Sequence, residues 1–204
     1  MRIAVLGAGV VGQTLAGKLR ELGHDVQIGT RNPRDGAVHY ADAAAGAELV
    51  INATNGAGSL EALAQAGGEN LTGKVLIDVA NALDFSRGRP PIVGVANDDS
   101  LGEQIQRAYP EARVVKALNT VNAGVMVDPG IIPGEHVLPI AGNDDAAKGQ
   151  VRELLGSFGW TGDRVIDLGD IGAARAMEMY LPLWLRLYQA VGTPQVNFVV
   201  VHAS

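Results

Sequence analysis

Cysteine is missing altogether from this sequence of 204 residues. Its absence excludes disulfide bonds, thiol catalysis and cysteine-ligated metals, so we expect no metal site and a cytoplasmic location. The sequence also lacks an apolar run of the roughly 20 residues that a membrane-spanning helix needs. It begins directly with a strand-like segment, and we therefore expect neither a signal peptide nor a membrane partner.

Basic residues are scarce as well, because 16 lysines and arginines face 22 aspartates and glutamates, for a formal net charge of −6. Non-specific nucleic-acid binding needs a basic face, so nucleic acid is not an expected partner. Glycine is abundant, with 27 residues that fall mostly at the ends of strand-like segments. The length and the 47% hydrophobic content predict one domain over residues 1–204, with 170–204 as a C-terminal helical extension.

The N-terminal segment predicts a nucleotide-binding unit. Ile3–Leu6 is wholly apolar, as expected of a parallel strand that is buried on both faces. A G-x-G-x-x-G turn follows it and opens a helix that we expect over Val10–Leu22. In such a turn the glycines permit the tight bend, the approach of a pyrophosphate and close packing of helix on strand. The candidate cofactor-binding residues of this turn are Gly7, Ala8, Gly9, Val10, Val11 and Gly12.

The end of the second strand indicates which dinucleotide is bound. NAD sites usually carry an acidic residue there for the ribose 2′-hydroxyl, but this chain has Thr30, Arg31 and Asn32. A carboxylate would repel a 2′-phosphate, whereas threonine and arginine donate hydrogen bonds to it. Arg34 adds a second positive charge. Alternatively, Arg31 is a solvated loop arginine without a ligand. We favour the interpretation that these four residues bind NADP(H).

Beyond Asn32, short apolar strands alternate with helical segments, which predicts an α/β, Rossmann-type doubly wound, mainly parallel sheet. The segment before the strand expected at 48–53 is too short for the usual helix, strand and second helix, so we expect a shortened second crossover. Residues 38–40 would be the remnant of a third strand, followed by a short helix at 40–45. Further strands are expected at 74–79, 113–118, 137–142, 164–168 and 196–201, and further helices at 100–108, 143–158 and 171–191. Pro182 should kink the last helix.

Polar residues follow the expected strands at their carboxyl ends, where open α/β sheets bind ligands. Thr54 and Asn55 are candidate cofactor contacts of this kind, although ordinary turn residues are an equally good interpretation. Ser59 is expected to cap the next helix, and Ser100–Glu103 fits a capping box for a later one. The long loop at 83–99 has the character of a lid.

Several motifs together resemble a known family. They are the glycine turn, Gly29-Thr30-Arg31-Asn32, Lys116-Ala117-Leu118-Asn119-Thr120, Ala141-Gly142-Asn143-Asp144-Asp145 and Asp167-Leu168-Gly169. In this order they resemble the NADP-dependent oxidoreductases of the deazaflavin coenzyme F420, and also the related cytosolic reductase domain of the six-transmembrane metalloreductases. The resemblance implies that the glycine turn and Thr30–Asn32 hold NADP, with Thr54, Asn55, Ala80 and Asn81 along its nicotinamide side.

The expected site offers little acid-base chemistry. Reduction of a carbonyl or imine usually needs a placed proton donor; Lys116 comes nearest but lies within a strand, so no catalytic residue is assigned. Hydride transfer to a flavin-like ring depends instead on stacking, orientation and exclusion of water. We expect Asn119, Thr120 and Asn122 to orient such a second ring, and Met126 or the last helix to wall its pocket.

Three functions remain open. The leading hypothesis is an NADP(H)-dependent oxidoreductase that transfers a hydride between NADP(H) and a deazaflavin (coenzyme F420) or a flavin such as FMN or FAD. The second is an NADPH-dependent reductase of a small imine or keto substrate, and the third is a non-catalytic NADP-binding regulator. The last helix is apolar around most of its circumference, so it is either deeply buried or shared with a partner subunit. We expect a homodimer through this C-terminal helix.

Overall fold

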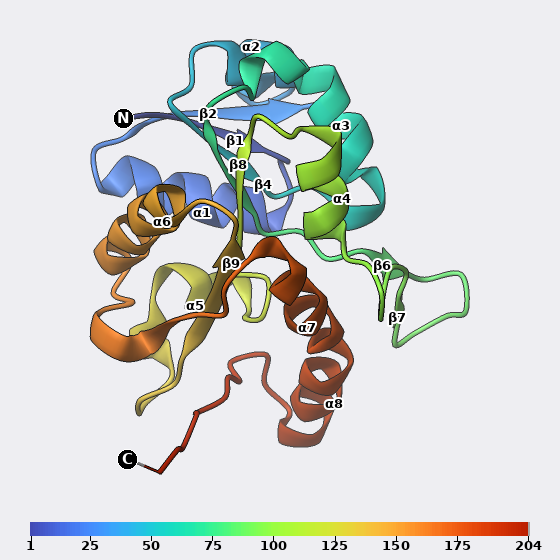
Figure 1. Cartoon of the computed structure of the whole chain (residues 1–204), viewed down its shortest axis with the longest axis vertical. Coiled ribbons are helices and arrows are strands. Elements are labelled where there is room, and N and C mark those ends of the chain that lie inside the picture. Colours follow the sequence, from blue (N-terminus) through green and yellow to red (C-terminus); the bar gives the residue numbers. More distant parts are fainter. Residues whose placement is uncertain (204) are drawn as a thin grey trace.

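The computed structural model describes residues 1–203 and contains an eight-stranded sheet with helices on both faces (Figure 1). The strands lie in the order β10-β9-β8-β5-β4-β1-β2-β3, and all neighbours are parallel except β8 and β9. Their bounds are β1 Arg2–Leu6, β2 Asp25–Thr30, β3 Val38–His39, β4 Leu49–Asn52, β5 Val75–Asp78, β8 Arg113–Ala117, β9 Leu138–Gly142 and β10 Val165–Asp167. The α/β, Rossmann-type class is confirmed.

The helices form two layers, as a doubly wound sheet requires (Figure 1). On one face lie α1 (Val10–Glu21), α5 (Ala123–Val127) and α6 (Asp145–Ser157). On the other lie α2 (Tyr40–Ala45), α3 (Ser59–Ala66) and α4 (Leu101–Ala108). Five 3-10 turns connect the elements: η1 Gly56–Gly58, η2 Gly68–Asn70, η3 Pro129–Ile131, η4 Gly162–Arg164 and η5 Ile171–Ala173. Two further helices, α7 (Ala174–Met179) and α8 (Leu181–Val191), follow the last strand.

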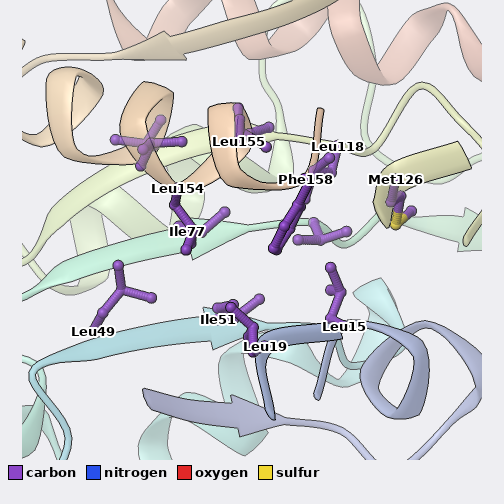
Figure 2. Packing of buried hydrophobic residues seen from close by; sticks show 14 of the residues in the cluster. Leu15, Leu19, Leu49, Ile51, Ile77, Leu118, Met126, Leu154, Leu155 and Phe158 are labelled. Carbon is purple, nitrogen blue, oxygen red and sulfur yellow. The ribbon is translucent and has the colours of Figure 1, made fainter. Parts of the chain in front are cut away.

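Side chains of the strands alternate between two hydrophobic cores, one on each face. In β1, Ile3 and Val5 enter the core under α1, whereas Ala4 and Leu6 enter the opposite core. Because successive side chains point to opposite faces and both faces are covered, the strand must be apolar throughout. Figure 2 shows part of the first core, which includes Leu15, Leu19, Leu49, Ile51, Ile77, Leu154 and Leu155.

The crossover after β2 is short, as the sequence predicts. After Thr30 the chain forms a loop over residues 31–37 and then enters β3. β3 pairs with the end of β2, where Val38 lies opposite Gly29. No helix lies between residues 30 and 38, a segment that the structure describes throughout. α2 then packs closely on β2 at Gly29. A Cβ at this position would lie only 3.1 Å from the Cβ of Ala43 in α2.

The C-terminal extension differs from the prediction in two ways. The helix expected at 171–191 is divided into η5, α7 and α8, and Pro182 stands in the first turn of α8, so it starts a helix instead of kinking one. The strand expected at 196–201 is not formed. The segment passes β9, where the Val137 amide donates to the Phe198 carbonyl oxygen at 3.1 Å. Because β9 already pairs with β8 and β10, it offers this segment no free edge.

One of the two helix caps expected above is confirmed. The Ser100 hydroxyl accepts from the Glu103 amide at the start of α4. Asp144, at the start of the helix expected over 143–158, caps α6. The prediction for Ser59 is wrong: Gly58 is the N-cap of α3, and the Ser59 hydroxyl enters a buried hydrogen-bond network instead. The loop at 83–99 contains a small antiparallel hairpin of β6 (Leu83–Asp84) and β7 (Ile92–Val93).

Over residues 1–203, no helix combines the length and the apolar character that crossing a membrane would demand.

Candidate functional site

The carboxyl ends of the central strands lie level with one another. Leu6 is paired with Asn52, Asn52 with Asp78, and Asp78 with Lys116. The loops that follow these strands therefore emerge at one edge of the sheet, where ligands bind in this architecture. A cavity of about 460 Å³ lies beyond that edge.

This cavity brings together most of the residues that the sequence places in the site. They are Val10, Val11, Thr54, Asn55, Ala80, Asn81, Asn119, Thr120, Asn122 and Met126. Of the other members of the glycine turn, Gly7, Ala8 and Gly9 precede α1, and Gly12 lies in its first turn. Thr30, Arg31, Asn32 and Arg34 do not line it; they lie at the end of β2 and in the turn that follows, where the sequence predicts the adenosine end of the cofactor.

Glycine is required at different positions of the turn for different physical reasons. Gly7 has a φ of +120°, and a Cβ there would clash with the carbonyl oxygen of Ala53. A Cβ on Gly12 would clash with the carbonyl oxygen of Gly7, so this position serves the close packing of α1 on its strand. At Gly9, in contrast, a Cβ would meet no atom within 4 Å. The fold therefore needs glycine at the first two positions, whereas the space outside Gly9 is open to a ligand.

The start of α1 is suited to an anion. Its N-cap is Gly9, so no side chain caps the first amides, and no acidic residue stands in the first turn. Uncapped amides at the positive end of a helix dipole attract phosphate groups.

Arg31 is held only weakly at the end of β2. Its guanidinium lies 3.0 Å from the Glu61 carboxylate, and both side chains are more than half exposed. Exposed ion pairs of this kind contribute about 0–1 kcal/mol. Arg31 can therefore exchange Glu61 for a phosphate at little cost, and Arg34 is exposed close by in the chain.

A buried hydrogen-bond network orients the loop after β4. The Thr54 hydroxyl donates to Asn52 Oδ1 at 2.7 Å and lies 2.8 Å from Ser59 Oγ. The amide of Asn52 donates in turn to Asp78 Oδ1 at 2.8 Å. Asn55 caps η1 through its side-chain oxygen. The Thr54 hydroxyl and the Asn55 side-chain oxygen are thus engaged within the protein, and both residues line the cavity.

Asn81 and Asn119 form a reciprocal pair across the cavity wall. Asn81 Nδ2 donates to the Asn119 carbonyl oxygen at 2.9 Å, and Asn119 Nδ2 donates to Asn81 Oδ1 at 3.0 Å. Asn119 Nδ2 also lies 3.1 Å from the carbonyl oxygen of Met177 in α7. The pair therefore joins the loops after β5 and β8 to the C-terminal extension.

The chain turns sharply at Leu118, immediately before this pair. Leu118 has a φ of +65°, a left-handed conformation that costs a leucine roughly 1–2 kcal/mol. The turn brings Asn119 and Thr120 to the cavity. Asn119 Oδ1 and Thr120 Oγ1 are buried without a hydrogen-bond partner in the part of the chain that the structure describes. Buried polar atoms are nearly always paired, so these two atoms fit a ligand that carries hydrogen-bonding groups.

Asn122 and Met126 occupy the short helix α5. The side-chain oxygen of Asn122 accepts from the Gly124 amide at 2.9 Å and so caps the helix. Met126 is buried at the cavity, and its carbonyl oxygen accepts from the indole of Trp160 at 2.9 Å. Met126 lines the cavity, whereas the side-chain oxygen of Asn122 is already engaged in capping α5.

Lys116 lies beneath the cavity and does not line it. Its fully buried ammonium is 2.8 Å from Asp78 Oδ2 and 2.7 Å from Glu178 Oε1, and it donates to the Ala80 carbonyl oxygen at 2.5 Å. Burial disfavours the charged form, but the two carboxylates outweigh this and raise the pKa of Lys116 above its ordinary value. A lysine that is sealed, paired and charged has no path to deliver a proton to the cavity.

Glu178 extends the same network to α4. Its two carboxylate oxygens accept from the amides of Leu101 and Gly102 at 2.9 and 3.1 Å. This buried carboxylate therefore joins α7, α4 and Lys116 of β8. It fixes the C-terminal extension to the sheet.

Apolar residues complete the cavity, and the sequence identifies them only in part. The last helix was expected as a wall in general terms; its contributing residues are Leu181, Trp184 and Leu185. Leu83 and Phe85 of the hairpin were not foreseen, because strands of two residues leave no readable pattern. Every lining residue falls within 1–203, and none of their side chains is ionisable.

Comparison with known proteins identifies the family. A family model described as NADP oxidoreductase, coenzyme F420-dependent, matches residues 2–82. A crystal structure from Arthrobacter sp. FB24, provisionally described as an F420-dependent NADP-reductase, is 53% identical with a TM-score of 0.95. The alignment covers 99% of this chain and 100% of that one. The chain belongs to the coenzyme F420-dependent NADP oxidoreductase family.

More distant relatives match the chain at lower identity. Metalloreductase STEAP3 of Rattus norvegicus is 28% identical over 198 residues, covering 90% of this chain. Metalloreductase STEAP2 of Homo sapiens is 28% identical over 194 residues, again covering 90% of this chain. The chain spans 38% and 36% of the length of these two proteins. An imine reductase from Myxococcus stipitatus is 17% identical with a TM-score of 0.65, covering 94% of this chain and 64% of that one, and shows the common fold.

Proposed function

We propose that the chain binds NADP(H) along the carboxyl edge of the sheet. The uncapped start of α1 and the open space at Gly9 fit the pyrophosphate. Thr30 and the weakly held Arg31 fit a 2′-phosphate. The unpaired polar atoms of Asn119 and Thr120 fit the ring end of the cofactor or its reaction partner.

The residues of the chain bind and orient, and the cofactor provides the reactive group. When bound, NADP(H) supplies a hydride at its nicotinamide ring. The Asn81–Asn119 pair holds two cavity walls at a fixed separation. The apolar side chains of Phe85, Trp184 and Leu185 exclude water from the space between them.

We infer that the hydride acceptor is a deazaflavin such as coenzyme F420, or a flavin. The observation that carries this inference is the cavity lining, which is largely apolar and has no ionisable side chain within the described residues. Reduction of a carbonyl or imine calls for a placed proton donor, and the nearest one, Lys116, is sealed beneath the cavity. A flavin-like ring needs stacking and orientation, which this lining provides.

The test is oxidation of NADPH by the purified protein with coenzyme F420, FMN and FAD, alongside a panel of cyclic imines and 2-keto acids. We expect turnover with at least one deazaflavin or flavin and none with the imines or keto acids. Turnover restricted to imines or keto acids would establish the second hypothesis. Tight NADP(H) binding without turnover of any acceptor would establish the non-catalytic regulator.

We further propose a homodimer in which a second copy covers α8. Leu183, Leu187 and Val191 recur every four residues on this helix and are 56%, 36% and 61% exposed. Trp184 and Leu185 of the same helix line the cavity, so a covered α8 would stiffen one wall. Sedimentation of the wild type should give a dimer mass, and Leu183→Lys with Leu187→Lys should give a monomer. A wild-type monomer at micromolar concentration would contradict the proposal.

A further inference from the structure

The loop of the β6–β7 hairpin carries two exposed arginines, Arg87 and Arg89. Neither forms an ion pair with another residue of 1–203. The carboxylate nearest in sequence, Asp84, accepts from the Ser86 amide and hydroxyl at 2.8 and 2.9 Å; these bonds and the more distant charge of Arg87 lower its pKa. Both guanidinium groups thus keep their hydrogen-bond donors open to a ligand, in a chain whose net charge is −6.

The loop starts at the cavity. Phe85, the first residue of the loop, lines the cavity and also an adjoining hollow of about 500 Å³. The guanidinium carbon of Arg89 lies 5.5 Å from the centre of the Phe85 ring, within the range of a cation–π contact. Arg87 lies two residues from Phe85 and two from Arg89 in the same loop. Figure 1 shows the hairpin projecting from the body of the molecule, and β7 lies against α8. Arg89 is therefore next to the cavity wall that Phe85 shares with the last helix, and Arg87 follows on the projecting loop.

The two arginines are separate from the cations expected to bind NADP. Arg31 follows β2, whereas the hairpin follows β5, and β1 and β4 lie between those strands in the sheet. The cavity between the two positions has no ionisable lining. Positive charge is thus placed at both ends of a neutral chamber, and the phosphates of one dinucleotide account for only one end.

We propose that Arg87 and Arg89 bind an anionic chain of the hydride acceptor, bearing phosphate or carboxylate groups, while the ring of the acceptor enters the cavity past Phe85. This inference rests on the proposed function and specifies the acceptor further. Guanidinium groups recognise phosphate and carboxylate through charge-assisted, bidentate hydrogen bonds. Their position outside the neutral chamber separates recognition of the chain from orientation of the ring.

The experiment compares acceptors that share a ring and differ in charge. FMN and riboflavin form one pair, and coenzyme F420 and its uncharged ribityl precursor form the other. KM is measured with NADPH for the wild type and for the double variant Arg87→Ala/Arg89→Ala. The control is Arg113→Ala, which removes a positive charge at the amino end of β8, away from the cavity. Each comparison is made at low and at high salt.

In the double variant, the ratio of KM for the charged acceptor to KM for its neutral partner should rise about three- to tenfold, as expected for two exposed ion pairs. High salt should abolish the difference, and Arg113→Ala should not reproduce it. A rise confined to FMN would assign the site to a phosphate monoester, and a rise confined to F420 to a longer phosphodiester and carboxylate chain. An unchanged ratio in both pairs would overturn the inference while leaving the proposed function intact.

If the wild type turns over none of the four acceptors, the proposed function fails, and binding decides the inference separately. Equilibrium titration of the NADP complex then replaces KM. Tighter binding of the charged member, lost in the double variant, would support the anion site. Equal binding of both members, or binding of neither, would refute it.

Discussion

Replacing Lys116 with methionine should destabilise the protein by about 3–5 kcal/mol. Methionine has a similar length but no charge, so the change strands Asp78 and Glu178, which are 0% and 1% exposed. Both carboxylates approach the same ammonium within 2.8 Å, and without it they would face each other in a buried space. The loss is large against the roughly 5–15 kcal/mol of stability that is typical of a folded protein.

Thermal unfolding gives the measurement. In a chain of this size, 1 kcal/mol corresponds to about 2–4 °C, so Lys116→Met should melt about 6–20 °C below the wild type. Adding Asp78→Asn should recover part of the loss, because one of the two stranded charges is removed while the side-chain oxygen still accepts from Asn52 and from the Ala80 amide. Lys74→Met is the control: this lysine donates to one carbonyl oxygen, that of Ala44, and should cost no more than about 1.5 kcal/mol.

The pH dependence separates a charge effect from a packing effect. The pKa of Lys116 is raised, so its contribution is fully present below the ordinary lysine value of 10.5 and is lost only as the pH rises through the raised value. The wild type should therefore keep this contribution between about pH 5 and 9. The deficit of Lys116→Met should therefore hold steady across this range and shrink as the pH rises above 10.5, where the wild type begins to lose the charge that the variant lacks. A deficit below about 1 kcal/mol at neutral pH, or one that does not shrink above pH 10.5, would refute the reasoning.

Three further perturbations test the site and its surroundings. The Gly9→Ala variant should unfold at the same temperature as the wild type but bind NADP(H) about tenfold more weakly or worse. The Gly12→Ala variant should instead lose about 1–3 kcal/mol of stability. Thermal unfolding and NADP(H) titration of both variants provide the test. Arg31→Ala should weaken NADP(H) binding about tenfold and leave NAD(H) binding unchanged, and equal losses for both cofactors would contradict its role. The Arg107 guanidinium lowers the pKa of Asp99 to about 2, so this stabilisation is present above pH 3.8 and is lost as the pH falls through 2. Asp99→Asn should thus cost about 1 kcal/mol at pH 6, after solvent screening, and little at pH 2 when unfolding by urea is compared.

The sequence predicts the fold class and most of the strands because both follow from local patterns. Apolar runs mark strands that are buried on both faces, and polar residues mark their carboxyl ends. Asn119 and Thr120 could therefore be placed at the carboxyl edge of the sheet without a structure, and the cavity lies there. The positive φ at Leu118, which turns the chain toward them, has no comparable signal, because it is imposed by the surrounding packing.

The contacts that the sequence could not predict join residues far apart in the chain. Glu178 reaches Lys116 and the start of α4 although more than sixty positions separate them, and no periodicity reports such a pairing. The error at Ser59 has the same origin: its hydroxyl can cap a helix locally, but the buried amide of Asn52 competes for it. Likewise, Val196–Val201 has strand composition but runs past β9, which is already paired on both sides.

The two sides of the cavity come from different parts of the chain. Everything proposed to hold NADP(H) comes from strands and turns before residue 124, whereas Leu181, Trp184 and Leu185 come from a segment after the last strand. That segment joins the rest of the fold through polar contacts at separate points: those of Glu178 and Asn119, the Arg175–Glu103 ion pair, and the hydrogen bonds of Asn197 to His136 and Val137. Replacing the C-terminal segment by another one that keeps a carboxylate at position 178 would therefore change the cavity wall formed by α8. The residues proposed to bind NADP(H) would stay the same. Descendants of one ancestral grip could in this way acquire different reaction partners by exchanging a single terminal stretch of chain.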